Sequence, residues 1–266
     1  MVTYHQFVSA FRKLELDPAR PVIAHTSLSA FGKVQGGVDT LLGALLASYA
    51  SVVMPVFTYK TMVTPECGPP DNALAYGKEK DRNYLADFYR PQLPADRLMG
   101  IVPETLRRYA KARRSRHPIL SFTGVNASQA LESQSIPEPL APIRVLAEAG
   151  SWVLLLGVNH TVNTSIHYAE RLAGRKQFVR WALTPRGVVE CPGFPGCSDG
   201  FEALAQDLEG VSRQTQVGQA LVQAVPLLQL IDIARARLEE DAAALLCKRS
   251  YCERCEDVRK ALVVNF

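Results

Sequence analysis

A histidine and a glutamate near the middle of the chain are the side chains best suited to chemistry. His167 and Glu170 stand three positions apart in the segment 150–171, so on a helix they share one face. A carboxylate beside an imidazole raises the basicity of the ring and fixes its orientation, which suits a general base. The competing interpretation is structural: Asn163 or Thr164 caps a helix, and the two side chains form an ordinary surface pair. Spacing alone favours the structural interpretation.

The residues around this pair predict a strand, a loop and a helix. Residues 152–156 are an apolar run of strand length, Gly157 interrupts it, and a polar segment follows until a helical pattern begins at Thr164. Open α/β sheets bind their ligands at such strand ends. His160 lies in the connecting loop, where it either reaches an acceptor substrate or holds the loop through a backbone hydrogen bond.

A second connection of the same kind lies near the start of the chain. Residues 21–24 predict a buried strand that ends at His25, and residues 38–49 predict a helix. The loop between them, 25–37, is rich in Ser and Gly. Its free backbone N–H groups and the helix N-terminus are attractive to phosphate. The loop matches neither the dinucleotide-binding nor the P-loop pattern, and an ordinary βα connection is the competing interpretation.

Strands and helices alternate along the rest of the chain and predict the fold class. Strands are expected at 51–59, within 113–126 and near 226–231, helices at 4–14, 100–111 and over most of the chain beyond 200, and a hairpin over 176–190. The sequence therefore predicts an α/β fold with a central mixed sheet flanked by helices on both faces. We expect a single domain, 1–266, with a long substrate-side loop at 60–98 and a Cys-rich part at 191–266.

The composition is that of an ordinary globular protein. Of 266 residues, 47% are hydrophobic and 21% are charged. No apolar run approaches the roughly 20 residues of a membrane helix. The first residues lack the apolar core of a signal peptide, so a cytoplasmic location without a membrane partner is expected. A net charge of +4 fits an anionic cofactor, but it is too weak and dispersed to predict nucleic-acid binding.

Most of the cysteines gather in the last third of the chain. The spacing C-x4-C-x2-C joins Cys247, Cys252 and Cys255, and a Gly/Pro-rich loop adds Cys197, with Cys191 as the alternate. Four thiolates suit tetrahedral zinc, so one interpretation is a closed structural zinc site that pins the C-terminal helix to that loop. The other interpretation is a set of buried free thiols, and both stay open.

Four separated segments together resemble one protein family. They are 25–37 (HTSLSAFGKVQGG), 52–59 (VVMPVFTY), 99–124 (MGIVPETLRRYAKARRSRHPILSFTG) and 154–170 (LLLGVNHTVNTSIHYAE). In this order they are similar to the aminoglycoside 3-N-acetyltransferase, or antibiotic N-acetyltransferase, family, and the likeness covers most of the chain. Members of the family transfer an acetyl group from acetyl-CoA to an amine. The resemblance implies the fold of that family and direct transfer to a small-molecule amine, with aminoglycoside antibiotics, and hence antibiotic resistance, as one case.

The resemblance also implies roles for individual residues. His167, in the TSxHxAE segment, is the expected catalytic base, and Glu170 is the acid that orients it. Acetyl-CoA binding is implied for His25, Thr26, Ser27, Leu28, Ser29, Gly32, Val34, Gly36 and Gly37, and for Ser115, His117, Ser121 and Phe122 of a second segment. The residues expected to face the acceptor amine are Tyr59, Glu66, Asp71, His160 and Asn163. A neutral imidazole can take the proton of the amine directly, so no covalent acyl-enzyme is needed.

The charge of the chain departs from what a polycationic acceptor favours. The loop 60–98 contains basic and acidic side chains in equal number, so it has no excess of carboxylates that would bind a polycation. The identity of the acceptor amine therefore stays open. Two other functions stay open as well. One is a CoA- or nucleotide-binding protein without turnover that acts as a sensor or interaction module. The other is a zinc hydrolase that uses His160, His167 and Glu170, although this spacing matches no zincin motif. A homodimer is not excluded.

Overall fold

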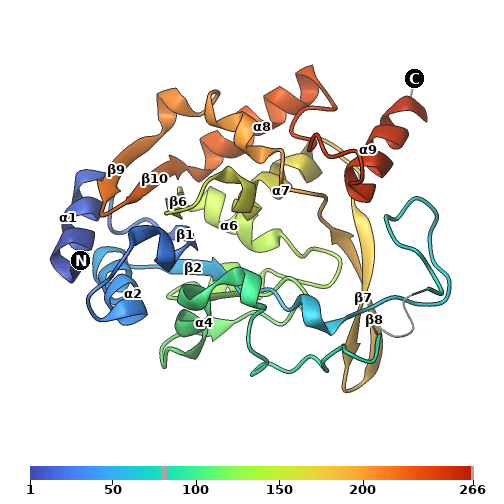
Figure 1. The fold of residues 1–266 in the computed structure, drawn as a ribbon, viewed down its shortest axis with the longest axis horizontal. Coiled ribbons are helices and arrows are strands. Elements are labelled where there is room, and N and C mark those ends of the chain that lie inside the picture. Colours follow the sequence, from blue (N-terminus) through green and yellow to red (C-terminus); the bar gives the residue numbers. More distant parts are fainter. Residues whose placement is uncertain (79–82, 265–266) are drawn as a thin grey trace.

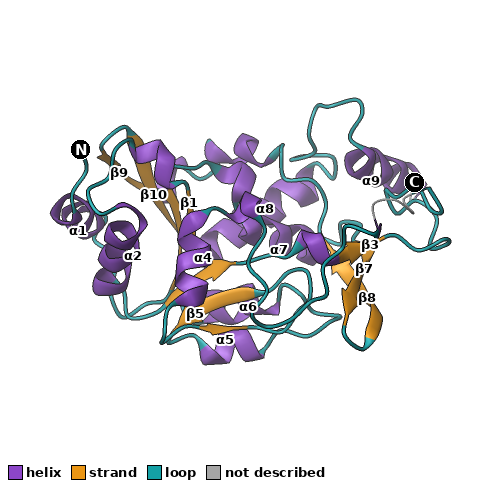
Figure 2. Ribbon diagram, turned by 60° about the horizontal axis from the view of Figure 1, so that its bottom comes forward, coloured by secondary structure: helices purple, strands orange, loops and turns teal. Residues whose placement is uncertain are grey.

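A seven-stranded mixed sheet organises the molecule in a computed structural model that describes residues 1–78 and 83–264 (Figures 1 and 2). Its strand order is β4-β5-β2-β1-β6-β10-β9. β1 runs parallel to its two neighbours, β2 and β6. β5 pairs antiparallel with β2, and β10 pairs antiparallel with β6. The strands are β1 (Val22–Thr26), β2 (Val52–Pro55), β4 (Arg113–Arg114), β5 (Phe122–Val125), β6 (Trp152–Leu156), β9 (Arg213–Val217) and β10 (Ala220–Pro226). The predicted α/β class with a mixed sheet is confirmed.

Helices cover both faces of this sheet (Figure 2). One face packs against α1 (Tyr4–Lys13), α2 (Gly37–Ser48) and α4 (Ile101–Arg108). The other packs against α5 (Ser128–Glu132), α6 (Ala141–Glu148), α7 (Thr164–Leu172) and α8 (Leu227–Glu240). In the described ranges, no helix combines the length and the apolar character needed to cross a membrane.

The central strands are apolar on both sides because both of their faces are covered. In β6, Leu154 and Leu156 belong to the hydrophobic cluster under α1, α2 and α4, while Val153 and Leu155 belong to the cluster on the opposite face. All four side chains are fully buried. An unbroken apolar run is typical of a strand buried on both faces, whereas a half-exposed strand alternates apolar and polar residues. The apolar run of the sequence therefore becomes the centre of the sheet.

A second, three-stranded sheet lies at the end of the molecule that also holds the C-terminal helix (Figure 1). It consists of β3 (Met62–Val63), β7 (Phe178–Thr184) and β8 (Gly187–Phe194), and the helix is α9 (Glu253–Val264). β7 and β8 are the hairpin expected over 176–190, so that prediction is confirmed. Of the long loop predicted at 60–98, residues 79–82 lie outside the described residues, as do 265–266 of the Cys-rich part.

Three local predictions differ from the structure. Residues 226–231 are not a strand: β10 ends at Pro226, and the apolar residues that follow repeat at helical spacing along the buried face of α8. The chain beyond 200 also contains the β9–β10 hairpin, which the sequence analysis missed. The side chains of β9 are mostly exposed because it is an edge strand, so the apolar signal of a strand is weak there. The strand expected at 51–59 ends early, at Pro55.

Gly157 ends β6 under the loop that follows β1, and it cannot carry a side chain without a clash. Its φ is +69°, and a Cβ would lie 2.7 Å from the Cβ of Ala30 and 3.1 Å from the carbonyl oxygen of Ser27. Gly174 has a similar φ of +74°, but a Cβ there would meet nothing within 4 Å. The same substitution at the two glycines therefore distinguishes the cost of backbone strain, present at both, from the cost of steric overlap, present only at Gly157.

We expect Gly174→Ala to lower the free energy of unfolding by about 1 kcal/mol, from left-handed backbone strain alone. Gly157→Ala should cost about 2–4 kcal/mol, because overpacking adds to that strain. Urea unfolding followed by circular dichroism measures both changes. Equal losses in the two variants would contradict the close approach of the β1 loop to Gly157.

Candidate active site

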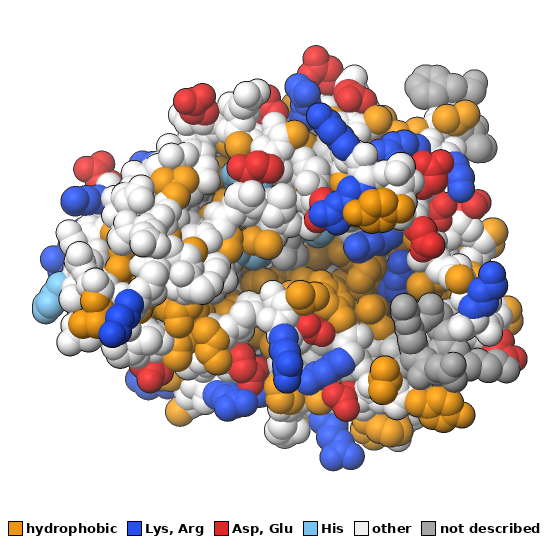
Figure 3. All heavy atoms as spheres, viewed as in Figure 1, with side chains coloured by type: hydrophobic (Ala, Val, Ile, Leu, Met, Phe, Trp, Pro, Cys, Tyr) orange, Lys and Arg blue, Asp and Glu red, His pale blue; other side chains and the backbone are white. Residues whose placement is uncertain are grey.

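A cavity of about 1080 Å³ opens at the carboxyl ends of β1, β2 and β6 (Figure 3). Its walls come from the segment after β1, residues after β2, the start of α4, the loop between β6 and α7, and the segment that follows β8. Parallel strands bring their carboxyl ends to one edge of a sheet, so these segments meet although they are far apart in sequence. The cavity lies where the sequence analysis expects a ligand.

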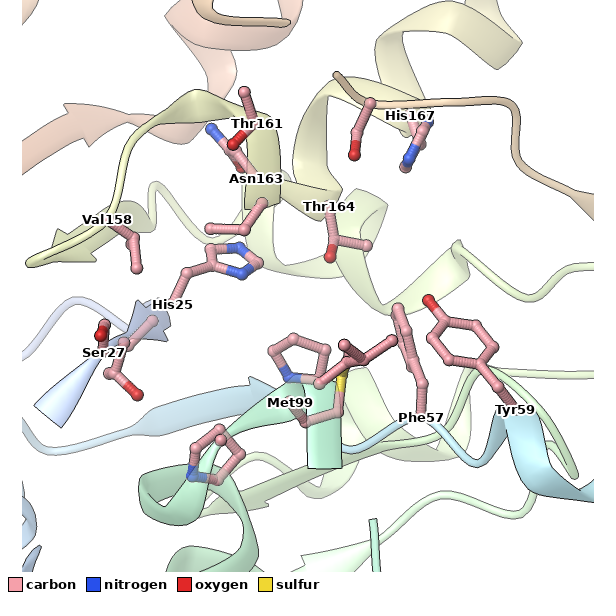
Figure 4. A pocket seen from close by; sticks show the side chains of 18 of the residues that line it. His25, Ser27, Phe57, Tyr59, Met99, Val158, Thr161, Asn163, Thr164 and His167 are labelled. Atoms are coloured by element: carbon pink, nitrogen blue, oxygen red, sulfur yellow. The ribbon is translucent and has the colours of Figure 1, made fainter. Parts of the chain in front are cut away.

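His167 lines this cavity (Figure 4), and it forms a buried hydrogen-bonded pair with Glu170. Asn163 caps the N-terminus of α7, since its side chain accepts a hydrogen bond from the Ser165 N–H, and the helix carries both side chains on one face. His167 Nδ1 lies 2.7 Å from Glu170 Oε2, and the two side chains are only 10% and 2% exposed. The alternative of an ordinary surface pair is therefore wrong.

Arg175 extends this pair into a chain of three side chains. Its Nη1 donates to Glu170 Oε1 at 2.7 Å, and its Nη2 donates to the carbonyl oxygens of Ala242 and Ala244, also at 2.7 Å. The two oxygens of Glu170 thus have different partners, and the guanidinium supplies the opposite charge that a buried carboxylate requires. A carboxylate at this contact favours the tautomer of the ring that carries its proton on Nδ1, and in that tautomer Nε2 is the basic nitrogen.

Most of the predicted acetyl-CoA residues after β1 line one side of the cavity. These are His25, Thr26, Ser27, Leu28, Ser29, Gly32, Val34 and Gly37, whereas Gly36 forms the left-handed cap of α2 and is not in the lining. The first turn of α2 starts at this wall, so its N–H groups lie near the loop. Burial, and after it the nearby His160, lowers the pKa of His25 to about 3, so this imidazole is uncharged at neutral pH.

The second predicted cofactor segment does not reach the cavity. Ser115 Oγ accepts from the Phe122 N–H at 2.8 Å, and His117 Nδ1 accepts from the N–H groups of Ile119 and Leu120. Ser121 Oγ donates to the carbonyl oxygen of Val56, and Phe122 packs in the core. None of Ser115, His117, Ser121 and Phe122 lines the cavity, and their contacts hold the β4–β5 connection instead. Their role beside the cofactor stays a prediction that the lining of this cavity does not support.

The residues expected at the acceptor divide into two groups. Tyr59 and Asn163 line the cavity, and Figure 4 shows Tyr59 on the side away from His25 and Ser27. His160 is buried behind the wall, where its ring contacts Asn163 at 3.3 Å and its backbone N–H donates to Glu202. Glu66 and Asp71 are exposed and do not line the cavity. The cavity wall thus gives no support to the prediction that these two carboxylates face the substrate, and it stays a prediction.

Four cysteines come together at the end of β8 and the start of α9. The sulfur atoms of Cys197, Cys247, Cys252 and Cys255 all lie within 4.8 Å of one another. Cys191 is not among them, because it lies on β8 and its thiol points to the carbonyl oxygen of Val189. Among the described residues, these four cysteines are the one group placed closely enough to hold a metal ion. His160, His167 and Glu170 are not placed in this way, so they do not form the site that a zinc hydrolase needs.

The sequence analysis missed several residues of the cavity wall. Phe57, Met99, Arg180 and Arg254 all line it, together with the segment that carries Asp199. None of them belongs to a motif with a chemical meaning of its own. Arg254 stands between Cys252 and Cys255, but the cysteine spacing gives no information about the direction of the side chain between them.

Comparison with known proteins places this architecture in one family. The model of the family described as aminoglycoside 3-N-acetyltransferase matches residues 23–239. Aminoglycoside N(3)-acetyltransferase IX of Micromonospora chalcea is 32% identical over 233 residues, which are 75% of this chain and 80% of the relative.

Solved structures of low sequence identity share the fold. The apoenzyme of aminoglycoside acetyltransferase AAC(3)-IVa has a TM-score of 0.80 at 22% identity and covers 97% of both chains. AAC-IIIb, solved as a binary complex with CoASH, has a TM-score of 0.70 at 23% identity and covers 90% of this chain and 96% of its own. The chain thus belongs to the aminoglycoside 3-N-acetyltransferase family and is an acyltransferase.

Proposed function

We propose that the chain transfers the acetyl group of acetyl-CoA directly to an amine nitrogen in the cavity, with His167 as the general base. The buried contact of Nδ1 with Glu170 carries this proposal, because it leaves Nε2 as the basic nitrogen at the wall. The amine attacks the thioester carbonyl carbon while its proton passes to Nε2. The tetrahedral intermediate then collapses, the carbon–sulfur bond breaks, and the CoA thiolate takes the proton from the imidazolium. Glu170 is a positioning residue, since it acts through the ring.

Acetyl-CoA is assigned to the side of the cavity formed by residues 25–37. Backbone N–H groups in this loop and at the start of α2 suit the negative charge of a diphosphate, and the same loop has hydroxyl groups at Ser27 and Ser29. Loop N–H groups also suit the oxyanion that develops on the carbonyl. The complex of AAC-IIIb with CoASH supports this choice of co-substrate. The acceptor is a small-molecule amine. Because the relatives are aminoglycoside N(3)-acetyltransferases, an aminoglycoside is the reference acceptor for assays.

We also propose a structural zinc ion held by Cys197, Cys247, Cys252 and Cys255. Zinc–sulfur bonds of about 2.3 Å in a tetrahedron separate the sulfurs by about 3.8 Å, which the observed spread of 4.8 Å or less accommodates. Such a closed site with four protein ligands leaves no position for a substrate. Zinc would fasten α9 to the segment after β8, and it takes no part in acetyl transfer.

Replacing His167 by alanine should abolish acetyl transfer and leave the affinity for CoA within a few fold. The assay is thiol release from acetyl-CoA with a panel of amines that includes an aminoglycoside, and calorimetry measures CoA binding. His5→Ala, at an exposed histidine of α1, is the matched control and should keep full activity. Loss of CoA binding in His167→Ala would make the residue structural. A wild-type chain that binds CoA but acetylates no amine would be a binding protein without turnover.

Glu170→Gln should lower kcat by about 10²-fold, because the neutral amide orients the ring but cannot stabilise the imidazolium. The KM for acetyl-CoA should stay the same, since Glu170 does not face the cofactor wall. The substitution also removes the ion pair with Arg175, which can destabilise the fold independently of catalysis. A thermal melt followed by circular dichroism measures that loss of stability. Full activity in a folded variant would remove Glu170 from the mechanism.

Protein purified without a chelator should contain about one equivalent of zinc by elemental analysis. Cys255→Ser should lose the metal and melt at a lower temperature, because metal binding contributes directly to folding. Cys191→Ser removes a buried thiol outside the cluster and should keep the zinc. Less than about half an equivalent in the wild-type chain would show that the four cysteines are free thiols.

A further inference from the structure

The cavity wall carries more positive than negative charge. Among the described residues that line it, the charged side chains other than histidine are Arg180, Arg254 and Asp199. Asp199 already has a cationic partner, since its Oδ2 lies 2.7 Å from Nη1 of Arg249. The described part of this wall therefore offers a cationic substrate one carboxylate, which already has a partner at the surface, whereas it holds two guanidinium groups.

Arg180 is a buried cation without a carboxylate partner in the described part of the chain. It is 6% exposed, and its Nη1 donates to the carbonyl oxygens of Asn72 and Val179 at 3.0 and 2.8 Å. Its guanidinium lies over the rings of Phe178 and Phe194, 5.4 and 5.0 Å from their centres. Burial, and then the charge of Arg254, lowers its pKa to about 10, so it stays protonated at neutral pH. Carbonyl groups and rings hold this charge but do not neutralise it. The exposed carboxylate of Glu253 opposes the fall of this pKa, but it is the weakest of the named influences on it.

Arg254 adds a second guanidinium to the same wall. It stands in the first turn of α9, and its Nη1 donates to the carbonyl oxygen of Gly196 at 2.9 Å. In the two described ranges no ion pair of Arg254 with a carboxylate is found. A guanidinium has five N–H donors, so this one contact leaves donors for a ligand. Arg254 also lies near Tyr59. Burial raises the pKa of the Tyr59 phenol, and the positive charge of Arg254 opposes that rise. Arg254 is therefore on the acceptor side of the cavity.

We infer that the acceptor amine carries an oxyanion, a carboxylate or a phosphate, which pairs with Arg254 and Arg180 in the cavity. This inference rests on the proposed acetyl transfer. An oxyanion supplies the counter-charge that the wall lacks and accepts the fork of N–H donors that a guanidinium presents. A polycation would instead place like charges against each other in a partly buried site, which opposes binding. Figure 3 shows side chains of both charges at the mouth of the same hollow, so the excess of positive charge belongs to the lining and not to the rim.

The two ends of the cavity keep this oxyanion apart from the phosphates of the co-substrate. The loop 25–37 follows β1 on one side of the molecule, while Arg180 on β7 and Arg254 on α9 belong to the other end (Figure 1). His167 comes from α7, between these parts of the wall. Protein saturated with CoA therefore tests the arginine end alone.

The test is equilibrium binding to CoA-saturated protein, measured by calorimetry with acceptors that differ in one group. 3-Aminopropyl phosphate and 4-aminobutyrate carry the oxyanion, 3-aminopropanol is the neutral match, and gentamicin is the polycation. We expect at least one of the two oxyanions to bind about tenfold or more tightly than the neutral and cationic probes. Arg254→Gln should remove that preference, and Arg254→Glu should shift it toward gentamicin. Lys260→Gln, which removes an exposed cation from the same helix, should leave all affinities unchanged.

Two outcomes separate this inference from the acetyl transfer. If gentamicin or aminopropanol binds the wild-type chain as tightly as both oxyanions do, the inference is wrong, even where acetylation proceeds. If the oxyanions bind in an Arg254-dependent way but no amine is acetylated, the transferase proposal fails while the anion site stands. The comparison of phosphate with carboxylate in the same titrations identifies which oxyanion the arginines prefer.

Discussion

A single buried carboxylate fixes the position of the imidazole at the cavity wall. Glu170 accepts from His167 Nδ1 with one oxygen and from Arg175 with the other, both at 2.7 Å. A carboxylate at this depth is costly unless its charge is balanced and its oxygens are hydrogen-bonded, and both conditions are met. Arg175 in turn donates to two carbonyl groups near the end of α8, so the orientation of the imidazole depends on a segment more than 60 residues away. A surface His/Glu pair would lack this restraint.

The sheet supplies the second requirement, which is to bring His167 to the loop after β1. β1 and β6 are parallel neighbours paired from Val22–Trp152 to Thr26–Leu156, so their carboxyl ends lie side by side. The pairing continues one step beyond, where the Ser27 N–H donates to the carbonyl oxygen of Leu156. Gly157 follows and lets the segments after β1 and β6 approach closely, since a side chain at this position would clash with Ala30. The loop and α7 diverge from this point, and the cavity opens between them.

Sequence reasoning found the parts of the site that are local and missed those that depend on tertiary contacts. His167 and Glu170 share one helix, so their spacing was enough to pair them. Arg175 lies five residues beyond Glu170, after α7 has ended, and no helical periodicity connects the two. Ser115 and Ser121 carry polar atoms near a strand end, but these atoms bond the β4–β5 connection to its neighbours. Polarity in a sequence does not distinguish a side chain that meets a ligand from one that holds a turn.

The acceptor wall depends on a region with little hydrophobic core of its own. Its apolar cluster consists of Cys197, Cys247 and Cys255 with Leu246 and Cys252 against them, far smaller than the two clusters on the sheet. Such a cluster gives little stability by burial alone. α9 also buries Val258 in the large cluster on the sheet, and direct bonds add to this in holding the segment after β8 against α9. Arg254 provides one such bond to Gly196, the residue before Cys197. The cysteines and the arginine thus act on the same short junction, and whatever fixes the sulfur atoms also fixes the position of the guanidinium in the cavity.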